Sequence, residues 1–321
     1  MTSETEKLIA ELPDSGAARR FIEDLEVKHP EHHSRLVKNA ALLSDAATLA
    51  AFSPLLATTL LQTPEYLWWL DDKRRSTAVR DKDVLVGSLK RFAAANPTLD
   101  PQVTFTRFRR RELLRIYLRD IRRLATIAEI TEEISNLADA TLETALAMAR
   151  AEIAERFGAA GNESSFCVIA LGKLGSRELN YSSDIDLVFL YSDEGQTTGG
   201  TRDGVTNREY FVKLAEYTIK LIGMHSVEGT AYRVDVRLRP HGTLGPLAAS
   251  LPDTVRYYKT DARAWERQVM IRSRCSAGDA GLFKRLYSEI ESLVFSQEET
   301  VENALANARA SKDKIDLTVR D

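Results

Sequence analysis

Three aspartates have the side-chain chemistry and the local setting of a metal site. Asp184 and Asp186 stand at the start of the apolar run 185–191, and Asp235 lies within the alternating run 232–239. Because side chains alternate between the two faces of a strand, Asp184 and Asp186 should share one face. Neighbouring carboxylates repel each other, and an ion that prefers oxygen ligands, such as Mg²⁺, relieves that repulsion. Asp-x-Asp also occurs in ordinary surface turns, but the strand context favours a metal site.

A glycine turn lies directly before the first two aspartates. The run 166–171 is short, apolar and rich in β-branched residues, which predicts a strand buried on both faces. Gly172 ends that strand, and Gly175 with Ser176 suits a tight turn into a short helix. Backbone N–H groups of such a turn can face a phosphate, and Lys173 could approach its oxygens.

The run 232–239 alternates between apolar and charged residues, and a proline comes directly after it. The alternation predicts a strand with one apolar face and one face that carries Arg233, Asp235, Arg237 and Arg239. Three arginines and one carboxylate on a single face would form a phosphate-binding wall with a third metal ligand.

These features together predict metal-assisted phosphoryl or nucleotidyl transfer. Two Mg²⁺ ions about 3.5–4 Å apart could stabilise both the attacking and the leaving oxygen of an in-line displacement. Other schemes fit worse. Residues 172–176 match neither the Walker A spacing nor the three-glycine Rossmann pattern. No cysteine and histidine spacing is typical of structural zinc, and Ser176 and Ser182 lack a histidine partner of the kind that serine hydrolases use.

The rest of the chain must position these groups. Residues 1–160 are rich in Ala, Leu, Glu and Arg, with prolines where helices should begin or end, and they predict a helical region. Within it, run 105–120 predicts a helix whose arginines either form a solvated face or face a phosphate or a partner. Apolar spacing predicts another helix over 205–224. We expect a nucleotidyltransferase core at 161–245 and a C-terminal helical extension, cut short, at 246–321.

The overall composition excludes several classes of protein. The chain has 321 residues, a formal net charge of −3 and a pI of about 6.1, which favours neither nucleic acid nor an anionic membrane as partner. Cys167 and Cys275 are too few for a disulfide framework, so we expect a reducing, cytoplasmic setting. The N-terminus lacks the pattern of a signal peptide, and Asp45 and Pro54 interrupt the most apolar window, so no membrane span is expected.

Several segments resemble one known family. Residues 172–187 and 232–240, together with 108–115 and 265–267, are similar to the bacterial glutamine synthetase adenylyltransferase/adenylyl-removing enzymes. The resemblance extends from about residue 40 to the end of the chain. It implies an α+β nucleotidyltransferase fold, in which a small mixed sheet has helices behind it and the glycine turn leads directly to the aspartate strand.

That family has one half that attaches AMP to a tyrosine of glutamine synthetase and another that removes it by phosphorolysis, which yields ADP. The amino-acid sequence of residues 180–186 and the helical region that begins at Met1 resemble the N-terminal, adenylyl-removing half. The resemblance implies Mg²⁺ as cofactor, with Mn²⁺ as the alternative ion, and ADP or ATP and inorganic phosphate as substrates. The family often has two glycines where this chain has Gly175 and Ser176, and it continues beyond Asp321 into a segment that would complete this half.

Residue roles can be assigned from the resemblance and from these patterns. The expected catalytic metal ligands are Asp184, Asp186 and Asp235. The expected nucleotide-binding and phosphate-binding residues are Gly172, Lys173, Gly175, Ser176, Arg233, Arg237 and Arg239. Glutamine synthetase is the implied partner, and a PII-type signal protein is a candidate second one. Two alternatives remain open at this stage: ATP-dependent adenylylation, and a docking module that binds nucleotide or partner without turnover.

Overall fold

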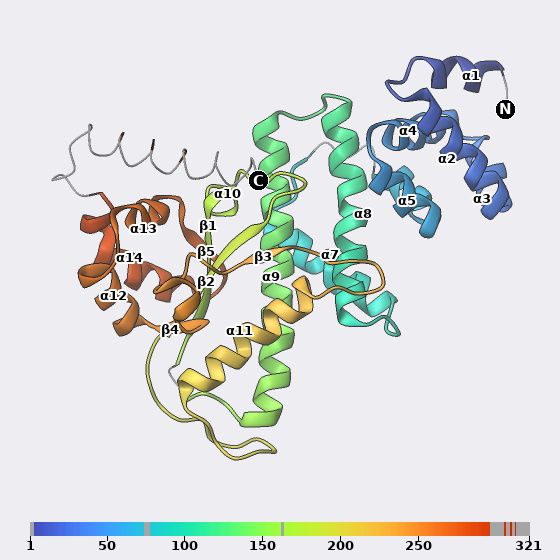
Figure 1. Ribbon diagram of the computed structural model, residues 1–321. Helices are drawn as coiled ribbons and strands as arrows, with labels where there is room; N and C mark the ends of the chain where they lie inside the picture. The colour runs from blue at the N-terminus through green and yellow to red at the C-terminus, as the bar shows by residue number, and fades with distance from the viewer. Residues whose placement is uncertain are drawn as a thin grey trace. The chain divides into compact units, whose positions relative to one another are not determined.

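Two units of different architecture make up the chain in the computed structural model (Figure 1). The first comprises Met1–Leu137 and His225–Ala231, and the second comprises Ala138–Met224 and Tyr232–Asp321. The structure describes residues 3–73, 78–161 and 164–295, together with Leu305, Arg309 and Lys312.

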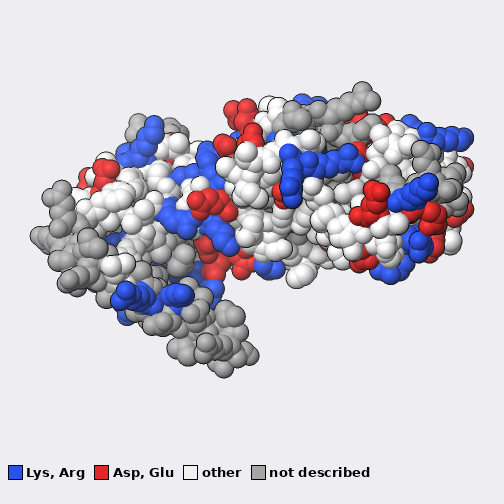
Figure 2. All heavy atoms as spheres, turned by 90° about the horizontal axis from the view of Figure 1, so that it is seen from above, with Lys and Arg blue, Asp and Glu red and all other residues white. Residues whose placement is uncertain are grey.

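Charged side chains of both signs are mixed on the surface. On the face drawn in Figure 2, Lys and Arg lie interspersed with Asp and Glu, which matches the near balance of 44 basic and 47 acidic residues in the sequence. Within the part of the chain that the structure describes, no helix combines the length and the apolar character needed to cross a membrane.

The first unit is helical, as its composition predicts. Its elements are α1 (Ser3–Ala10), α2 (Ser15–Lys28), α3 (Pro30–Leu36), α4 (Ala40–Phe52), α5 (Pro54–Gln62), α6 (Tyr66–Lys73), α7 (Lys82–Ala95), α8 (Pro101–Ile121) and the part of α9 (Ile127–Phe157) up to Leu137. Pro30, Pro54 and Pro101 each begin a helix, where the missing N–H of proline leaves no intrahelical bond unmade.

Two arginines of α8 contradict the interpretation that the arginines of run 105–120 form a solvated face. Arg115 and Arg119 are buried, and both pair with the buried carboxylate of Glu133 on α9. Glu133 also accepts a hydrogen bond at 3.0 Å from the backbone N–H of Arg80. A solvated face is therefore wrong for Arg115 and Arg119, because a carboxylate from the next helix compensates their charge inside the unit.

The second unit is built on a mixed sheet, which confirms the predicted α+β class. Its strands are β1 (Phe166–Leu171), β2 (Ile185–Tyr191), β3 (Val234–Asp235), β4 (Ala248–Ser250) and β5 (Arg274–Gly278). The order is β3-β2-β1-β5, and β4 also pairs with β2. Pairing is antiparallel between β1 and both β2 and β5, and parallel between β2 and both β3 and β4.

Helices cover both faces of this sheet (Figure 1). The helices of this unit are the part of α9 from Ala138 onward, α10 (Gly172–Gly175), α11 (Asn207–Gly223), α12 (Leu251–Thr260), α13 (Ala264–Val269) and α14 (Ala280–Val294), with the short 3₁₀ turns η1 (Gly242–Leu244) and η2 (Met270–Arg272). The helix predicted over 205–224 is confirmed as α11, and its Phe211 stacks on Phe166 and Tyr191 of the sheet.

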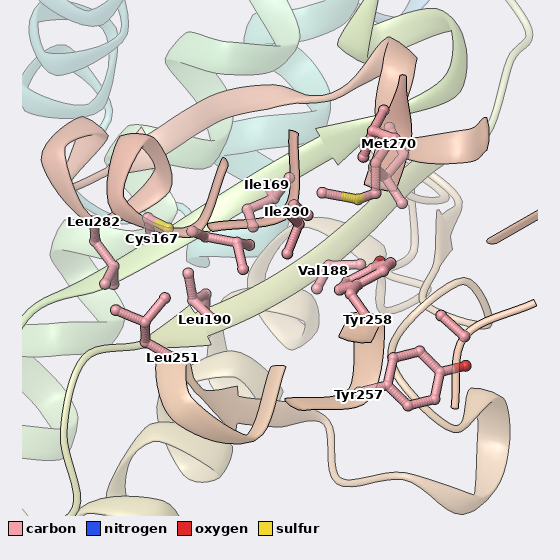
Figure 3. Close-up of a cluster of buried hydrophobic side chains, with 14 residues drawn as sticks. Cys167, Ile169, Val188, Leu190, Leu251, Tyr257, Tyr258, Met270, Leu282 and Ile290 are labelled. Atoms are coloured by element: carbon pink, nitrogen blue, oxygen red, sulfur yellow. The ribbon is translucent and has the colours of Figure 1, made fainter. Parts of the chain in front are cut away.

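The opposite face carries the hydrophobic cluster drawn in Figure 3. Cys167 and Ile169 of β1 and Val188 and Leu190 of β2 pack there against residues of α12 and α14, such as Ile290. Strand β1 is buried at every position, as predicted. Because alternate residues share a face, this cluster shows which side of β2 the even-numbered residues occupy.

Two expectations about the extent of elements differ from the structure. The sheet is not confined to 161–245, since β4 and β5 come from the segment after residue 245. The strand predicted over 232–239 is wrong in length, because β3 contains only Val234 and Asp235. In the C-terminal extension expected over 246–321, the structure contains the helices α12, α13 and α14 up to Val294, and most residues after Phe295 lie outside the described part of the chain.

Candidate functional site

The first part of the site is the junction of β1 and α10. Gly172 has φ +56°, and a Cβ built at this position would lie 2.7 Å from Oδ2 of Asp186. A side chain at residue 172 would thus collide with the carboxylate and strain the backbone. The glycine allows the main chain and the Asp186 carboxylate to lie close together.

Gly175 has a different physical reason. A Cβ at this position would lie 1.8 Å from the carbonyl oxygen of Arg272 in η2. Because no side chain fits there, Gly175 permits close packing between α10 and the backbone before β5. The sequence interpretation assigned this glycine to a phosphate-facing turn, and the packing against Arg272 is a requirement that the local sequence does not reveal.

The three aspartates lie at one end of β2, on one face. Asp186 and Asp235 are register partners on the parallel strands β2 and β3. Asp186 shares its face with Val188 and Leu190, and paired residues of neighbouring strands point to the same side. Asp184 immediately precedes β2. The structure therefore brings Asp235 beside Asp186 although they are distant in sequence.

The two paired carboxylates have opposite electrostatic environments. Burial, followed by the charges of Asp235 and Asp184, raises the pKa of Asp186. Hydrogen bonds from Arg237 lower the pKa of Asp235. Asp186 is thus the buried carboxylate that the negative charges of both other aspartates repel.

Arg233 and Arg237 each hold one of the other acids. Arg233 pairs with Asp184 and donates to the carbonyl oxygen of Ser182 at 2.7 Å. The Nε of Arg237 lies 2.9 Å from Oδ2 of Asp235, and its backbone N–H donates to Oδ1 at the same distance. Arg239 instead donates to the carbonyls of Val236, Thr243 and Gly245, so its guanidinium stabilises the loop after β3.

Lys173 lies in α10, and Ser176 directly follows it. Nζ of Lys173 is 3.4 Å from the hydroxyl of Ser183, in the turn that leads into β2. Oγ of Ser176 accepts a hydrogen bond at 2.5 Å from Nε of Arg272, which also pairs with Glu178. Both turns are therefore tied to neighbouring segments by side-chain contacts.

Arg272 and Arg274 are the residues that sequence reasoning missed. Arg274 donates to the carbonyl of Leu174 at 2.9 Å and pairs with Asp139 at 2.7 Å. Together with Arg272, it holds α10 from the side of β5. The arginines at 267, 272 and 274 were the available signal, but their long sequence separation from the glycine turn concealed the contact.

The three carboxylates fit a divalent cation by their chemistry. Among the described residues, no group of three or more His, Cys, Asp or Glu side chains is arranged to hold a metal ion. Arg233 and Arg237 occupy the carboxylates of Asp184 and Asp235. The donor set nevertheless suits a hard cation, because all three donors are carboxylates. A cation would also offset the two effects that raise the pKa of Asp186, which are its burial and then the repulsion from Asp235 and Asp184.

The pKa of Asp186 gives a testable prediction. In protein free of divalent ions, a ¹³C-carboxyl NMR titration should place it above the ordinary value of about 3.9. The substitution Asp235→Asn should lower it, since one repelling charge is removed. Because the folded pKa lies above the unfolded one, the contribution of Asp186 to stability is fully present below the unfolded pKa and is lost as pH rises through the folded pKa. An unchanged Asp186 midpoint in Asp235→Asn would contradict the coupling.

Comparisons with known proteins support one family. The sequence model described as "Glutamate-ammonia ligase adenylyltransferase" matches residues 43–288. A bifunctional glutamine synthetase adenylyltransferase/adenylyl-removing enzyme of Nitrosococcus oceani is 36% identical over 273 residues, which cover 83% of this chain and 28% of that protein. The equally named protein of Pseudomonas aeruginosa is 39% identical over 194 residues, or 59% of this chain and 20% of that protein.

A third relative with the same name, from Hahella chejuensis, is 33% identical over 275 residues, which cover 84% of this chain and 28% of that protein. The chain thus spans between 20% and 28% of the length of these three relatives. The family match covers more than half of the chain and includes the glycine turn and all three aspartates. On these grounds the chain belongs to the glutamate-ammonia ligase adenylyltransferase family, a family of nucleotidyltransferase enzymes.

Proposed function

We propose that this chain carries a metal-dependent nucleotidyl-transfer centre that removes AMP from an adenylyl-tyrosine of glutamine synthetase. The observation that carries the proposal is the register pairing of Asp186 with Asp235, beside Gly172 and close to Asp184. Carboxylates on neighbouring strand ends beside a glycine turn suit the binding of a divalent ion and a phosphate group. The names of the relatives support glutamine synthetase as the partner.

The direction of the reaction is proposed as phosphorolysis. An oxygen of inorganic phosphate attacks the phosphorus of the AMP group, and a new P–O–P linkage forms. The bond between that phosphorus and the tyrosyl oxygen breaks, and the phenolic oxygen takes a proton. The products are ADP and unmodified tyrosine. The similarity of residues 180–186 to the adenylyl-removing half supports this direction.

The acidic and the basic residues of the site would have different roles. Asp184, Asp186 and Asp235 would hold the ion, proposed as Mg²⁺, which would supply positive charge for the reacting phosphate oxygens. The side chains of Arg233 and Arg237 are 68% and 76% exposed, so each can turn to a phosphate once its aspartate binds the ion. Lys173 and the backbone around Gly172 would bind the nucleotide phosphates.

The test incubates the chain with adenylylated glutamine synthetase, inorganic phosphate and Mg²⁺ and measures ADP by chromatography. A parallel reaction contains unmodified glutamine synthetase and ATP. ADP formation in the first reaction supports phosphorolysis. Incorporation of AMP in the second without ADP in the first would instead support the adenylylating direction. A PII-type protein, added to both, tests whether it changes either rate.

We expect Arg272 to act on this site through Ser176. The substitution Arg272→Gln removes the 2.5 Å hydrogen bond to Ser176 and should weaken ADP binding by about three- to tenfold, measured by calorimetry. In a Ser176→Ala background the same substitution should have little further effect, because the two residues would act as one unit. Arg256→Gln, which alters an exposed ion pair with Asp253, is the matched control. Equal losses in both backgrounds would show that Arg272 does not act through Ser176.

A further inference from the structure

One cavity lies within the helical unit, and the residues that line it are distant in sequence from the aspartates. It has a volume of about 740 Å³ and is lined by residues of α6, α7 and α8, of the segment before α6 and of the segments between these helices. Cavities of about 300–1,000 Å³ are typical of small-molecule sites. Four arginines and two glutamates line it, together with the aromatic residues Tyr66, Trp69 and Phe92.

In one part of the cavity lining, the guanidinium of Arg111 lies against two aromatic rings. Its guanidinium carbon lies 4.7 Å from the ring centroids of both Trp69 and Phe92, so the planar cation is held between aromatic faces. Nη2 donates to Glu112 at 3.0 Å, whereas the buried Nε has no hydrogen-bond partner among the described residues. This part of the cavity lining thus combines flat apolar surfaces with a cationic guanidinium.

The acid next to Arg111 is already neutralised. Glu112 is fully buried and accepts from Arg80 at 2.8 Å as well as from Arg111 at 3.0 Å. One carboxylate therefore faces two guanidinium groups. Desolvated charges need compensation. The excess of positive charge in this part of the cavity lining therefore favours an anion in the cavity.

The remaining polar groups that line the cavity do not cancel its preference for an anion. Arg107 pairs with Glu228, with Nε 2.7 Å from Oε1. Burial raises the pKa of Tyr66 to about 12, so its hydroxyl stays a neutral hydrogen-bond donor at ordinary pH. At the rim, Arg91 is exposed and donates to Ser88 at 3.2 Å, without an acidic partner among the described residues. The second glutamate, Glu65, is also exposed.

We infer that this cavity is a second ligand site, which binds a small organic anion. The ligand would carry a carboxylate or a phosphate group, and a flat or apolar body. The guanidinium groups of Arg91 and Arg111 would receive the anionic group, and Trp69 and Phe92 would contact the body. None of these residues belongs to the aspartate site, so the inference and the proposed function can fail separately.

The test monitors the indole N–H signals of ¹⁵N-labelled protein by NMR. Trp69 lines the cavity, whereas Trp68 stacks on His32 and Trp265 belongs to the other unit, so these two serve as internal references. Trp69→Phe assigns the reporter signal. The probes are phenyl phosphate and benzoate, with neutral benzamide as the comparison. A saturable shift of the Trp69 signal with either anion, and a much smaller one with benzamide, is expected.

Variants at the rim complete the test. Arg91→Gln should weaken binding of the effective probe by about three- to tenfold, because a charge-assisted contact is lost. Arg91→Lys should retain most of the affinity, and Lys90→Gln, on an exposed neighbouring position of α7, should leave it unchanged. A response to phenyl phosphate alone assigns a phosphate ester, and a response to benzoate alone assigns a carboxylate. No Trp69 shift with either anion, equal shifts with benzamide, or unchanged affinity in Arg91→Gln would overturn the inference.

Discussion

The substitution Asp186→Asn is expected to reduce ADP release from adenylylated glutamine synthetase by at least about a thousandfold. Asp186 is the most central of the three acids, since it pairs in register with Asp235 and is influenced by the charges of both other aspartates. An amide keeps the shape of the side chain but removes the negative charge that a divalent ion requires. The measurement is the initial rate of ADP formation at saturating Mg²⁺ and phosphate.

Loss of folding should not accompany this loss of turnover. The raised pKa of Asp186 means that its ionised form is disfavoured in the folded chain, so the neutral asparagine should unfold at the same temperature or slightly higher. Asp203→Asn, at an exposed loop position of the same unit, is the control and should keep full activity. Near-normal ADP release by Asp186→Asn would exclude Asp186 as a metal ligand.

The substitution Glu133→Gln should lower the free energy of unfolding of the helical unit by about 3–5 kcal/mol. Glu133 is fully buried and compensates both Arg115 and Arg119, which are buried as well. Without its charge, two guanidinium groups remain in the interior with no carboxylate at this position. Urea unfolding monitored by tryptophan fluorescence measures the change, because Trp68 and Trp69 belong to this unit.

The neighbouring residue provides the control for that experiment. Glu132 is exposed on the same helix, so Glu132→Gln should change the unfolding free energy by less than about 0.5 kcal/mol. Comparable losses in the two variants would mean that the general charge of α9, and not the buried contact, stabilises the unit.

Strong local patterns made the centre of the fold predictable. The apolar run 166–171 and the aspartates before and within β2 could be placed by strand periodicity, which depends only on neighbouring residues. The sequence also predicted helix α11 from its apolar spacing. In these segments the burial of one face and the local pattern agree.

The prediction of β3 was wrong in length for a physical reason. Residues 232–239 alternate, but Asp235 accepts a hydrogen bond from the backbone N–H of Arg237, which turns the chain after two strand residues. Strands β4 and β5 have the opposite problem, because Ala248–Ser250 and Arg274–Gly278 lack β-branched residues. Their pairing with β2 and β1 defines them, and pairing is not visible in a single segment.

Long-range contacts account for what was missed at the site. Gly175 must lack a side chain because the carbonyl of Arg272 lies close to it, and the hydroxyl of Ser176 accepts from the Arg272 guanidinium. Arg272 is nearly a hundred residues away in sequence. The buried state of Arg115 likewise depends on Glu133 from the next helix. A sequence pattern shows that a charge is present, but the partner that compensates it is fixed only when the chain folds.

The short segment His225–Ala231 belongs to the helical unit although it comes after a long stretch of the other unit. Its Glu228 pairs with Arg107, and its carbonyl accepts from Arg110 on the same helix. During synthesis on a ribosome, these two arginines emerge more than a hundred residues before their acceptor. These two contacts of the N-terminal helices therefore cannot form until Glu228 has been synthesised. A fragment cut after Leu137 would leave both arginines without this acceptor, so expression trials should retain the later segment.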